Sequence, residues 1–263
     1  MSGADPPPPD LVGVVLAAGA GTRLAPLTRL RPKALCPVDG SPLVDHALAR
    51  VAPHVAEVAV NVHHGRLLME AHLTRAGAAV RPHLSVEHER ARGTAGALGL
   101  LRGWIAGRGV LLTNADAWLP VDLTAFVAGW DGERVRLLCV EDPARGDFGS
   151  LRYCGAALLP WRCVAGLGEE PTGLYEVMWR AEAEAGRLDL ATHVGPFVDC
   201  GSVADYLEAN LAASGGEAVV GVGAQLGEGC EVVRSVVWDD AEVAPGERLV
   251  DAVRAGTVTV LVR

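Results

Sequence analysis

Lys33 is the single lysine of this chain, and it stands in a segment whose residue types could bind phosphate. The 263 residues include 23 Lys and Arg together, so every other basic side chain is an arginine. Lysine offers a compact ammonium on a flexible stem, whereas arginine offers a planar fork. A lysine retained among so many arginines therefore indicates a site that a guanidinium does not serve. Chance survival of one dispensable lysine is the alternative.

A glycine-rich turn precedes Lys33. Residues 11–17 (LVGVVLA) form an apolar run typical of a buried strand, and GAGTRL follows at 19–24. Backbone N–H groups of such a turn can approach phosphate oxygens. The Rossmann fingerprint requires a third glycine where Leu24 stands, and a Walker loop requires Gly-Lys-Ser/Thr. The succession GTRL, PLT and PKAL is therefore a phosphate-binding motif of another kind.

The elements that must position this motif alternate between apolar strands and amphipathic helices. Strands are predicted at 11–17, 57–62, 80–86, 110–113 and 135–140. Helices are predicted at 42–51, 66–75, 95–105 and 122–128. The second of these helices carries Leu67, Leu68, Ala71 and His72. Such alternation predicts a Rossmann-like, mostly parallel α/β sheet covered on both faces. Ligands of these sheets lie at the carboxyl ends of the strands.

The pattern of apolar residues changes after residue 215. Aliphatic residues recur there every six residues in two sets, the second set one step out of phase: Val220, Leu226 and Val232, then Val237, Val243 and Leu249. Hexad spacing with glycines between is typical of a short β-helix, and an ordinary β-hairpin tail is the alternative. We predict three parts: a disordered Pro-rich tail at 1–10, a catalytic domain at 11–215 and a hexapeptide-repeat β-helix at 216–263.

Bulk properties exclude several classes of partner. The net charge of −9 and the pI of about 5.4 argue against a nucleic-acid groove, and no apolar run is long enough to cross a membrane. The first ten residues lack the features of a signal peptide. Six scattered cysteines form neither a zinc motif nor a disulfide framework, which favours a reducing cytoplasm.

Residues 16–38, LAAGAGTRLAPLTRLRPKALCPV, resemble the signature LAAGxGTRLxPLTxxxPKxLxPV of the sugar-1-phosphate nucleotidyltransferases. Further matches follow in the family's order across residues 11–210: GTAGAL at 93–98, TNAD at 113–116, DP at 142–143 with FG at 148–149, and DCG at 199–201 with DYL at 205–207. Among these enzymes the chain is most similar to the mannose-1-phosphate guanylyltransferases. The resemblance implies a nucleotide-diphospho-sugar transferase fold with a left-handed C-terminal β-helix.

The resemblance also implies the reaction. A nucleoside monophosphate passes from an NTP to a sugar-1-phosphate, giving a nucleotide-sugar, GDP-mannose-like, and pyrophosphate. Such transfers depend on positioning and charge neutralisation. Mg²⁺ would be held by Asp116 and Asp199, while Arg23 and Lys33 would neutralise the triphosphate as catalytic residues. The nucleotide-binding residues would be Ala18, Gly19, Gly21, Thr22, Glu89, Gly93 and Thr94. The sugar phosphate would meet Gly155, Glu176 and Arg152.

Several of these residues have a purely structural alternative. Asp116 could cap a helix entering at 118–120, and Asp199 could cap a helix that starts near Val203. Arg29 and Arg31 could be solvated loop charges. Glu87 is expected to face water, and Glu176 could be an ordinary surface glutamate on a helix.

The chain departs from the family in one place. The Glu-Lys-Pro hairpin that normally follows residue 151 is absent, and Arg152 is the nearest cation. This loss motivates a second hypothesis, a non-catalytic nucleotide-sugar-binding regulatory subunit on the same fold. A hexapeptide acyltransferase is disfavoured because the predicted β-helix is short and lacks a catalytic histidine. A homo-oligomer formed through the β-helix is possible.

Overall fold

The computed structural model describes residues 10–75 and 79–262 of the chain, which divides into two compact units. Unit 1 comprises Met1–Ala18, Ala47–Asn114 and Val121–Gly195, and unit 2 comprises Gly19–His46, Ala115–Pro120 and Pro196–Arg263. Except for Asp10, the predicted N-terminal tail lies outside the described residues. Within those residues, no helix is long and apolar enough to cross a membrane.

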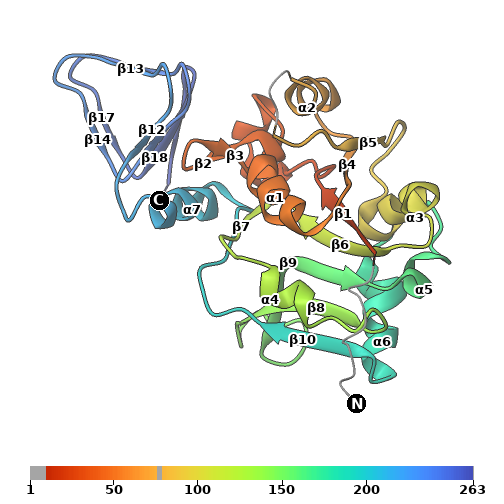
Figure 1. Cartoon of the computed structure of the whole chain (residues 1–263). Helices are drawn as coiled ribbons and strands as arrows, with labels where there is room; N and C mark the ends of the chain where they lie inside the picture. The colour runs from red at the N-terminus through yellow and green to blue at the C-terminus, as the bar shows by residue number, and fades with distance from the viewer. Residues whose placement is uncertain (1–9, 76–78, 263) are drawn as a thin grey trace. The chain divides into compact units, whose positions relative to one another are not determined.

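Unit 1 is built on a seven-stranded sheet with the order β10-β8-β9-β6-β1-β4-β5 (Figure 1). The strands are β1 (Leu11–Leu16), β4 (Val58–Val62), β5 (His83–Val86), β6 (Gly109–Asn114), β8 (Val135–Glu141), β9 (Leu151–Leu159) and β10 (Leu188–Thr192). Neighbouring strands run parallel except at β9, which is antiparallel to both β6 and β8. The prediction of a mostly parallel α/β sheet is confirmed.

The central strands of this sheet are buried along almost their whole length. Every residue of β4 is buried, and in β1 and β6 only the last residue is partly exposed. The helices of unit 1 are α1 (Leu43–Val51, whose first turn belongs to unit 2), α2 (Arg66–Leu73), α3 (Gly93–Ile105), α4 (Thr124–Ala128), α5 (Trp161–Val164) and α6 (Arg180–Glu184). In α3, Ala95, Leu98 and Leu101 join the core that contains Val12 and Val14 of β1. The apolar residues of α3 recur at helical spacing, so that one face of this helix packs on the strands.

The helix predicted at 66–75 is present as α2, and its buried face does not include the two leucines named in the sequence analysis. Met69 and Leu73 are the buried residues, whereas Leu67 is 79% exposed and Leu68 is 50% exposed. The positions i and i+4 of Met69 and Leu73 define one face. Leu67 and Leu68 lie away from that face, so apolar residue type alone does not identify the buried side of this helix.

Unit 2 gathers short elements around helix α7 (Val203–Ala213). Strand β2 (Pro37–Val38) pairs with β3 (Ser41–Pro42), and β7 (Ala117–Trp118) pairs with β11 (Val198–Asp199), both antiparallel. The loop after the glycine turn contains short 3₁₀ helices at Thr22–Leu24, Leu27–Arg29 and Lys33–Leu35. A further 3₁₀ turn, Ala52–His54, belongs to unit 1.

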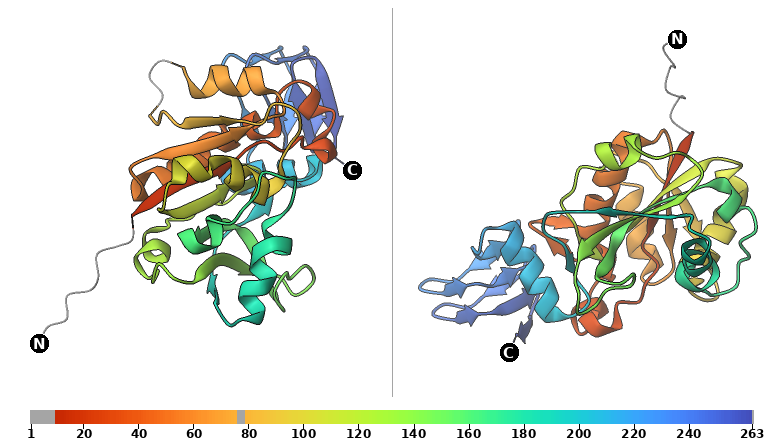
Figure 2. Two further views of the ribbon diagram at one scale, coloured as in Figure 1. Left: turned by 90° about the vertical axis from the view of Figure 1, so that its right-hand side faces the viewer. Right: turned by 90° about the horizontal axis from the view of Figure 1, so that it is seen from below.

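The C-terminal segment stacks short parallel strands in successive coils (Figure 2). Its strands are β12 (Val219–Val220), β13 (Gln225–Leu226), β14 (Glu231–Val233), β15 (Val236–Val237), β16 (Glu242–Val243), β17 (Arg248–Val250), β18 (Ala252–Ala255) and β19 (Val258–Leu261). The predicted hexad positions face one another between coils, because Val220 pairs with Val237 and Leu226 with Val243. Only the last pair, β18 with β19, is an antiparallel hairpin.

Each coil is one residue shorter than three hexads, which explains why the second set of aliphatics is out of phase. The register advances by 17 residues, as in Val219 against Val236 and Val236 against Val253. Residues with positive φ recur at the same interval, for example Gly229 (φ 70°) and Gly246 (φ 69°). Glycine adopts this left-handed conformation without steric cost. The spacing of these glycines in the sequence therefore sets where each coil turns a corner.

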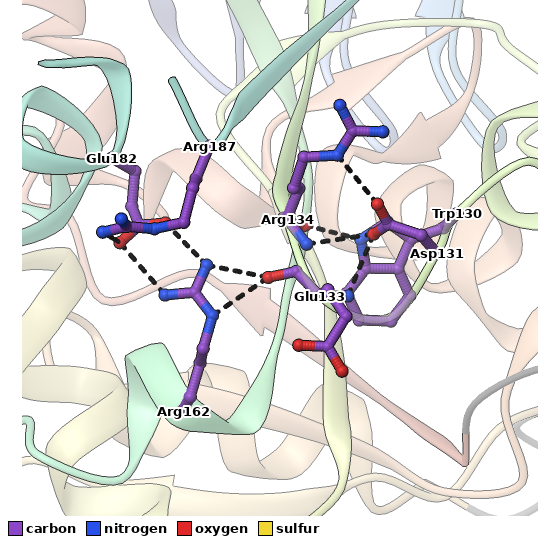
Figure 3. A network of polar contacts seen from close by, with 7 residues as sticks. All are labelled: Trp130, Asp131, Glu133, Arg134, Arg162, Glu182 and Arg187. Atoms are coloured by element: carbon purple, nitrogen blue, oxygen red, sulfur yellow. Dashed lines mark hydrogen bonds and ion pairs between the residues drawn. The ribbon is translucent and has the colours of Figure 1, made fainter. Parts of the chain in front are cut away.

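A buried carboxylate ties together three segments of unit 1 (Figure 3). Glu182 of α6 is 6% exposed and accepts hydrogen bonds from Arg162 at 2.6 and 3.1 Å and from Arg187 at 2.9 and 3.1 Å. Arg162 also donates to the backbone oxygen of Glu133 at 2.7 and 3.0 Å. The hydrogen bonds from Arg162 and Arg187 lower the pKa of Glu182 to about 2.

We expect Glu182→Gln to lower the free energy of unfolding by about 1–3 kcal/mol at pH 7, because both arginines lose their charged partner. The loss stays moderate because the arginine side chains themselves are 38% and 50% exposed. Since the pKa of the folded state lies below the ordinary glutamate value of 4.5, this contribution is fully present above that value. It is lost as the pH falls from about 4.5 towards 2. Urea unfolding at pH 7 and pH 3.5 measures the change. Glu184→Gln, on the exposed side of the same helix, is the control, and an equal loss in both variants would contradict the assignment.

Candidate active site

The glycine turn of unit 2 is held in shape by its contact with Lys33. Gly21 has a φ of +59°, and a Cβ on it would lie 2.8 Å from the Cβ of Lys33, so any larger residue would displace one of them. The first 3₁₀ helix begins at Thr22, with Leu24 buried beneath it. Apart from its chain neighbours, no described residue has an atom within 4 Å of the point where a Cβ on Gly19 would stand. The turn therefore combines a fixed half with a half that a ligand can approach.

Lys33 lies between the two aspartates that the sequence singled out. Its Nζ is 3.3 Å from Oδ2 of Asp116 and 3.6 Å from Oδ1 of Asp199. The lysine side chain is only 8% exposed, whereas those of the aspartates are 51% and 31% exposed. A buried ammonium thus stands behind two carboxylates that remain open to solvent.

Strand pairing brings the two aspartates together although they lie far apart in the sequence. Asp199 ends β11 and stands opposite Ala117 of β7, and the N–H of Cys200 donates to the carbonyl oxygen of Asp116 at 3.2 Å. Neither aspartate caps a helix. Asp116 precedes the strand β7, and α7 is capped by Ser202 in a capping box with Asp205. The capping alternatives are therefore wrong for both residues.

The two carboxylates suit a hard divalent cation. The described residues contain no group of three or more His, Cys, Asp and Glu side chains able to hold a metal alone. Mg²⁺ does not require one, because it binds one or two carboxylates and completes its shell with water and substrate phosphates. Asp116 and Asp199, which converge on the single point where Nζ lies, meet that requirement.

Arg23 adds a second cation beside this pair. Its guanidinium atoms lie 3.0–3.4 Å from the point where a Cβ on Gly201 would stand. Glycine at 201 therefore leaves room for the guanidinium of Arg23 beside the backbone two residues after Asp199. Unit 2 thus brings together Gly19, Gly21, Thr22, Arg23, Lys33, Asp116 and Asp199.

In unit 1, Glu87 carries a buried hydrogen-bond network at the strand ends, so the expectation that it faces water is wrong. Glu87 is 1% exposed and accepts from Nδ2 of Asn61 at 2.7 Å and from the backbone N–H of Arg92 at 2.7 Å. Asn61 in turn accepts from the N–H of Ala17 at 2.7 Å. The network fixes the end of β1, next to Ala18, relative to the residue before α3. Glu89 is exposed.

Exchange of two glutamates separates these roles. We expect Glu87→Gln to lower the free energy of unfolding by about 1–3 kcal/mol, because the new amide presents a donor to Asn61 or to the N–H of Arg92 and leaves a buried group unsatisfied. Glu89→Gln, on the exposed side of the same loop, should leave unfolding unchanged. Chemical denaturation of both variants measures the difference. If Glu89 binds a nucleotide, its variant raises KM for the NTP without a loss of stability.

The GTAGALG segment at the start of α3 makes room for another stretch of backbone. A Cβ on Gly93, Gly96 or Gly99 would lie 2.0–2.6 Å from carbonyl oxygens of residues 168–172. The hydroxyl of Thr94 accepts from the N–H of Leu174 at 2.8 Å. These glycines are thus required by close packing in unit 1, and nucleotide binding by Gly93 and Thr94 stays a prediction.

The residues predicted for the sugar phosphate come from β9 and from the π-helical turn Tyr175–Trp179. Gly155 has a φ of +99° and accepts from the hydroxyl of Thr113 at 3.0 Å. Arg152 forms an ion pair with Asp142 at 3.5 Å. The carboxylate of Glu176 is exposed and lies over Gly173. Their role toward a sugar stays a prediction.

Arg50 is a residue that the sequence reasoning missed. It is 8% exposed at the end of α1, and it donates to the hydroxyl of Thr113 at 2.9 and 3.1 Å and to the carbonyl oxygen of Asn114 at 3.2 Å. Burial lowers its pKa to about 10, so it stays charged at neutral pH. The signal was available, since Arg50 shares the face of Leu43 and Ala47 in the predicted helix.

Unit 1 carries a mostly parallel α/β sheet, and unit 2 holds a lysine between two aspartates beside a glycine turn. Residues 12–147, just over half of the chain, match the NTP_transferase family, described as nucleotidyl transferases. The chain belongs to this family. The resemblance to the sugar-1-phosphate nucleotidyltransferases is thereby confirmed.

Individual relatives differ in the base that their names specify. The chain is 39% identical over 132 residues to an N-acetylmuramate alpha-1-phosphate uridylyltransferase of Caulobacter vibrioides, covering 47% of this chain and 54% of that protein. It is 31% identical over 115 residues to a mannose-1-phosphate guanylyltransferase of Mycobacterium tuberculosis, covering 43% of this chain and 32% of that protein. The chain thus spans about half of the first relative and a third of the second.

The fold is shared with a solved structure over nearly the whole chain. A mannose-1-phosphate geranyltransferase of Thermus thermophilus superposes with a TM-score of 0.69 at 22% identity and covers 96% of this chain and 95% of its own. At this identity the match concerns the fold alone.

Proposed function

We propose that this chain transfers a nucleoside monophosphate from an NTP to a sugar-1-phosphate and releases pyrophosphate. The observation that carries the proposal is the convergence of Lys33, Asp116 and Asp199 beside a glycine turn with open space at Gly19. An oxygen of the sugar phosphate attacks the α-phosphorus, the new P–O bond forms, and the bond from the α-phosphorus to the bridging oxygen of pyrophosphate breaks. This chemistry requires cations around the triphosphate rather than a strong nucleophile on the protein.

The residues of unit 2 would act on the triphosphate. Backbone N–H groups at Gly19 and Gly21 would bind phosphate oxygens, and Arg23 and Lys33 would neutralise the charge that develops on the leaving group. Asp116 and Asp199 would hold Mg²⁺, which when bound supplies further neutralisation of the phosphates. In unit 1, Ala18, Glu89, Gly93 and Thr94 would contact the nucleoside, and Gly155, Glu176 and Arg152 the sugar phosphate.

Two bases remain candidates. The sequence motifs favour guanine and a GDP-mannose-like product, whereas the name of the Caulobacter relative at 39% identity favours uracil. The loss of the Glu-Lys-Pro lysine concerns only the acceptor side, and the retained lysine and aspartates disfavour the non-catalytic regulatory subunit. We further propose that the enzyme works in the cytoplasm, and that its β-helix forms the contact of any homo-oligomer. Light scattering of the purified chain tests the latter.

A substrate matrix tests the proposal. The purified chain with Mg²⁺ is incubated with each of GTP, UTP, dTTP and ATP against mannose-, glucose-, N-acetylglucosamine- and N-acetylmuramate-1-phosphate, and pyrophosphate release is measured. We expect one base to dominate, and the favoured pair identifies the product. Release that depends on the sugar phosphate supports transfer. Absence of release with every pair, together with tight binding of a nucleotide-sugar, would instead support the regulatory subunit.

A further inference from the structure

The apolar core of unit 2 is continuous from the glycine turn to the β-helix. It contains residues of the loop around Lys33, of the segments that follow Asp116 and Asp199, of α7 and of the coils: among them Leu24, Leu27, Cys36, Trp118, Cys200, Tyr206, Val236, Trp238 and Val253. The interior of the coils further along forms a separate cluster that includes Val243 and Leu249. One side of the β-helix therefore shares its core with the loop that carries Lys33, while the rest of the β-helix has a core of its own.

Trp238 makes the polar contact within this shared core. It follows β15 and is 2% exposed, and its Nε1–H donates to the hydroxyl of Tyr206 at 3.0 Å. The Tyr206 hydroxyl donates to the carbonyl oxygen of Pro37, to which Nδ2 of Asn210 also donates at 3.4 Å. Burial raises the pKa of Tyr206 well above its ordinary value, so the hydroxyl keeps its proton and can donate.

The other face of the contact is a cation. The guanidinium of Arg31 lies over the ring of Trp238, 4.3 Å from the ring centroid. Arg31 is therefore not a freely solvated loop charge, which corrects the alternative considered from the sequence. A guanidinium over a buried indole face is attracted by the ring quadrupole.

These contacts fall on both sides of Lys33. Arg31 precedes it by two residues and Pro37 follows it by four. Between them the chain forms the 3₁₀ turn Lys33–Leu35, closed by hydrogen bonds from the N–H of Leu35 to the oxygen of Pro32 at 2.8 Å and from the N–H of Cys36 to the oxygen of Lys33 at 2.9 Å. Because the turn is so short, the positions of its two ends determine where Lys33 lies.

We propose that Trp238 of the β-helix is a positioning residue for Lys33, acting through Arg31 on one side and through Tyr206 and Pro37 on the other. The C-terminal coils then serve the reaction by fixing the ammonium between Asp116 and Asp199. The catalytic consequence rests on the proposed function, whereas the placement of the lysine can be tested without it.

Because Lys33 is the single lysine of the chain, its chemical labelling gives a readout that does not depend on activity. Apart from the N-terminus it is the one amine of the chain, so its labelling by an amine-reactive reagent can be followed by mass spectrometry of its peptide. Trp238→Leu removes both the indole donor and the ring face, and Trp238→Phe retains a ring for Arg31 but no donor. We expect the labelling rate of Lys33 to rise roughly tenfold in Trp238→Leu and less in Trp238→Phe. Val243→Ala, which opens the other cluster of the β-helix, is the matched control and should leave the rate unchanged.

Kinetics supply the second readout. In Trp238→Leu we expect kcat to fall roughly tenfold while KM for the sugar-1-phosphate changes less than about twofold. Arg31→Met should reproduce part of this loss, and the double variant with Trp238→Leu should lose less than the sum of the two, because both remove the same contact. Arg31→Lys, which keeps a cation over the ring, should restore part of the rate.

The outcomes separate the two proposals. Unchanged Lys33 labelling in both Trp238 variants and in Arg31→Met, or an equal rise in Val243→Ala, would overturn the positioning role whatever the activity. If Trp238→Leu does not fold, Trp238→Phe and Arg31→Met decide by the same criteria. If labelling rises as expected but the wild-type chain releases no pyrophosphate from any substrate pair, the proposed function fails while the placement of Lys33 by Trp238 stands.

Discussion

Asp199→Asn should lower kcat/KM for pyrophosphate release by roughly a thousandfold, a loss of about 4 kcal/mol of transition-state stabilisation. The side chain is one of two carboxylates that converge on the point where Nζ of Lys33 lies, 3.6 Å away. An amide of the same shape keeps the β7–β11 pairing but removes the negative charge that a hard divalent cation requires. The remaining activity should demand a much higher Mg²⁺ concentration, which a Mg²⁺ titration of initial rates measures.

Asp205→Asn is the matched control for this variant. Asp205 lies six residues further on and belongs to the capping box of α7, where its carboxylate accepts from Ser202 at 2.7 and 3.0 Å. Its replacement should cost about 1 kcal/mol of stability and leave the Mg²⁺ requirement unchanged. If Asp199→Asn retains more than about a tenth of the wild-type rate with the same Mg²⁺ dependence, the carboxylate does not hold the metal.

The parallel sheet was predictable because two independent features of the sequence mark its strands. β1, β4 and β6 are apolar along their length, and helices of clear period separate them, so type and order follow from the sequence. β9 was missed because it runs against its neighbours and its sequence, LRYCGAALL, carries no helix before it to mark a crossover. The pairing of β8 with β9 is also irregular between Leu138 and Cys139.

Within the candidate site, the motifs predicted which residues lie close together better than they predicted what surrounds them. Lys33, Asp116 and Asp199 do lie together, as their order in the motif suggested. The burial of Glu87 was not predictable, because it depends on Asn61, a residue 26 positions away that faces it from the neighbouring strand. A glutamate in a polar stretch reads as solvated until the strand beside it is known.

The β-helix shows the same limit at a larger scale. Its period is visible in the sequence, since Val220 and Val237 repeat at the coil length of 17 residues. Its attachment is not, because the contact of Trp238 with Arg31 and Tyr206 joins residues that no local rule connects. A division of the chain at residue 215 treats the coils as an appendage, whereas the compact units place them with the loop of Lys33 and both aspartates.

Lys33→Arg should lower kcat by roughly a hundredfold or more although the positive charge is retained. The site leaves little room for a larger head group, since the lysine side chain is 8% exposed and its Nζ already lies 3.3 Å from Asp116 and 3.6 Å from Asp199. A planar fork would also bind two carboxylate oxygens at once and hold Asp116 and Asp199 more firmly than a single ammonium does. Those carboxylates would then be withheld from the metal.

This second effect gives the variant a signature beyond loss of rate. Because a guanidinium competes with the metal for the same carboxylates, added Mg²⁺ should restore part of the activity of Lys33→Arg, whereas it should restore none to Lys33→Met, which lacks a competing cation. Arg29→Lys, an exchange at an exposed position of the same loop, is the control and should behave as the wild type. Full activity of Lys33→Arg would show that the site requires only a charge, and the retention of one lysine among so many arginines would then carry no chemical meaning.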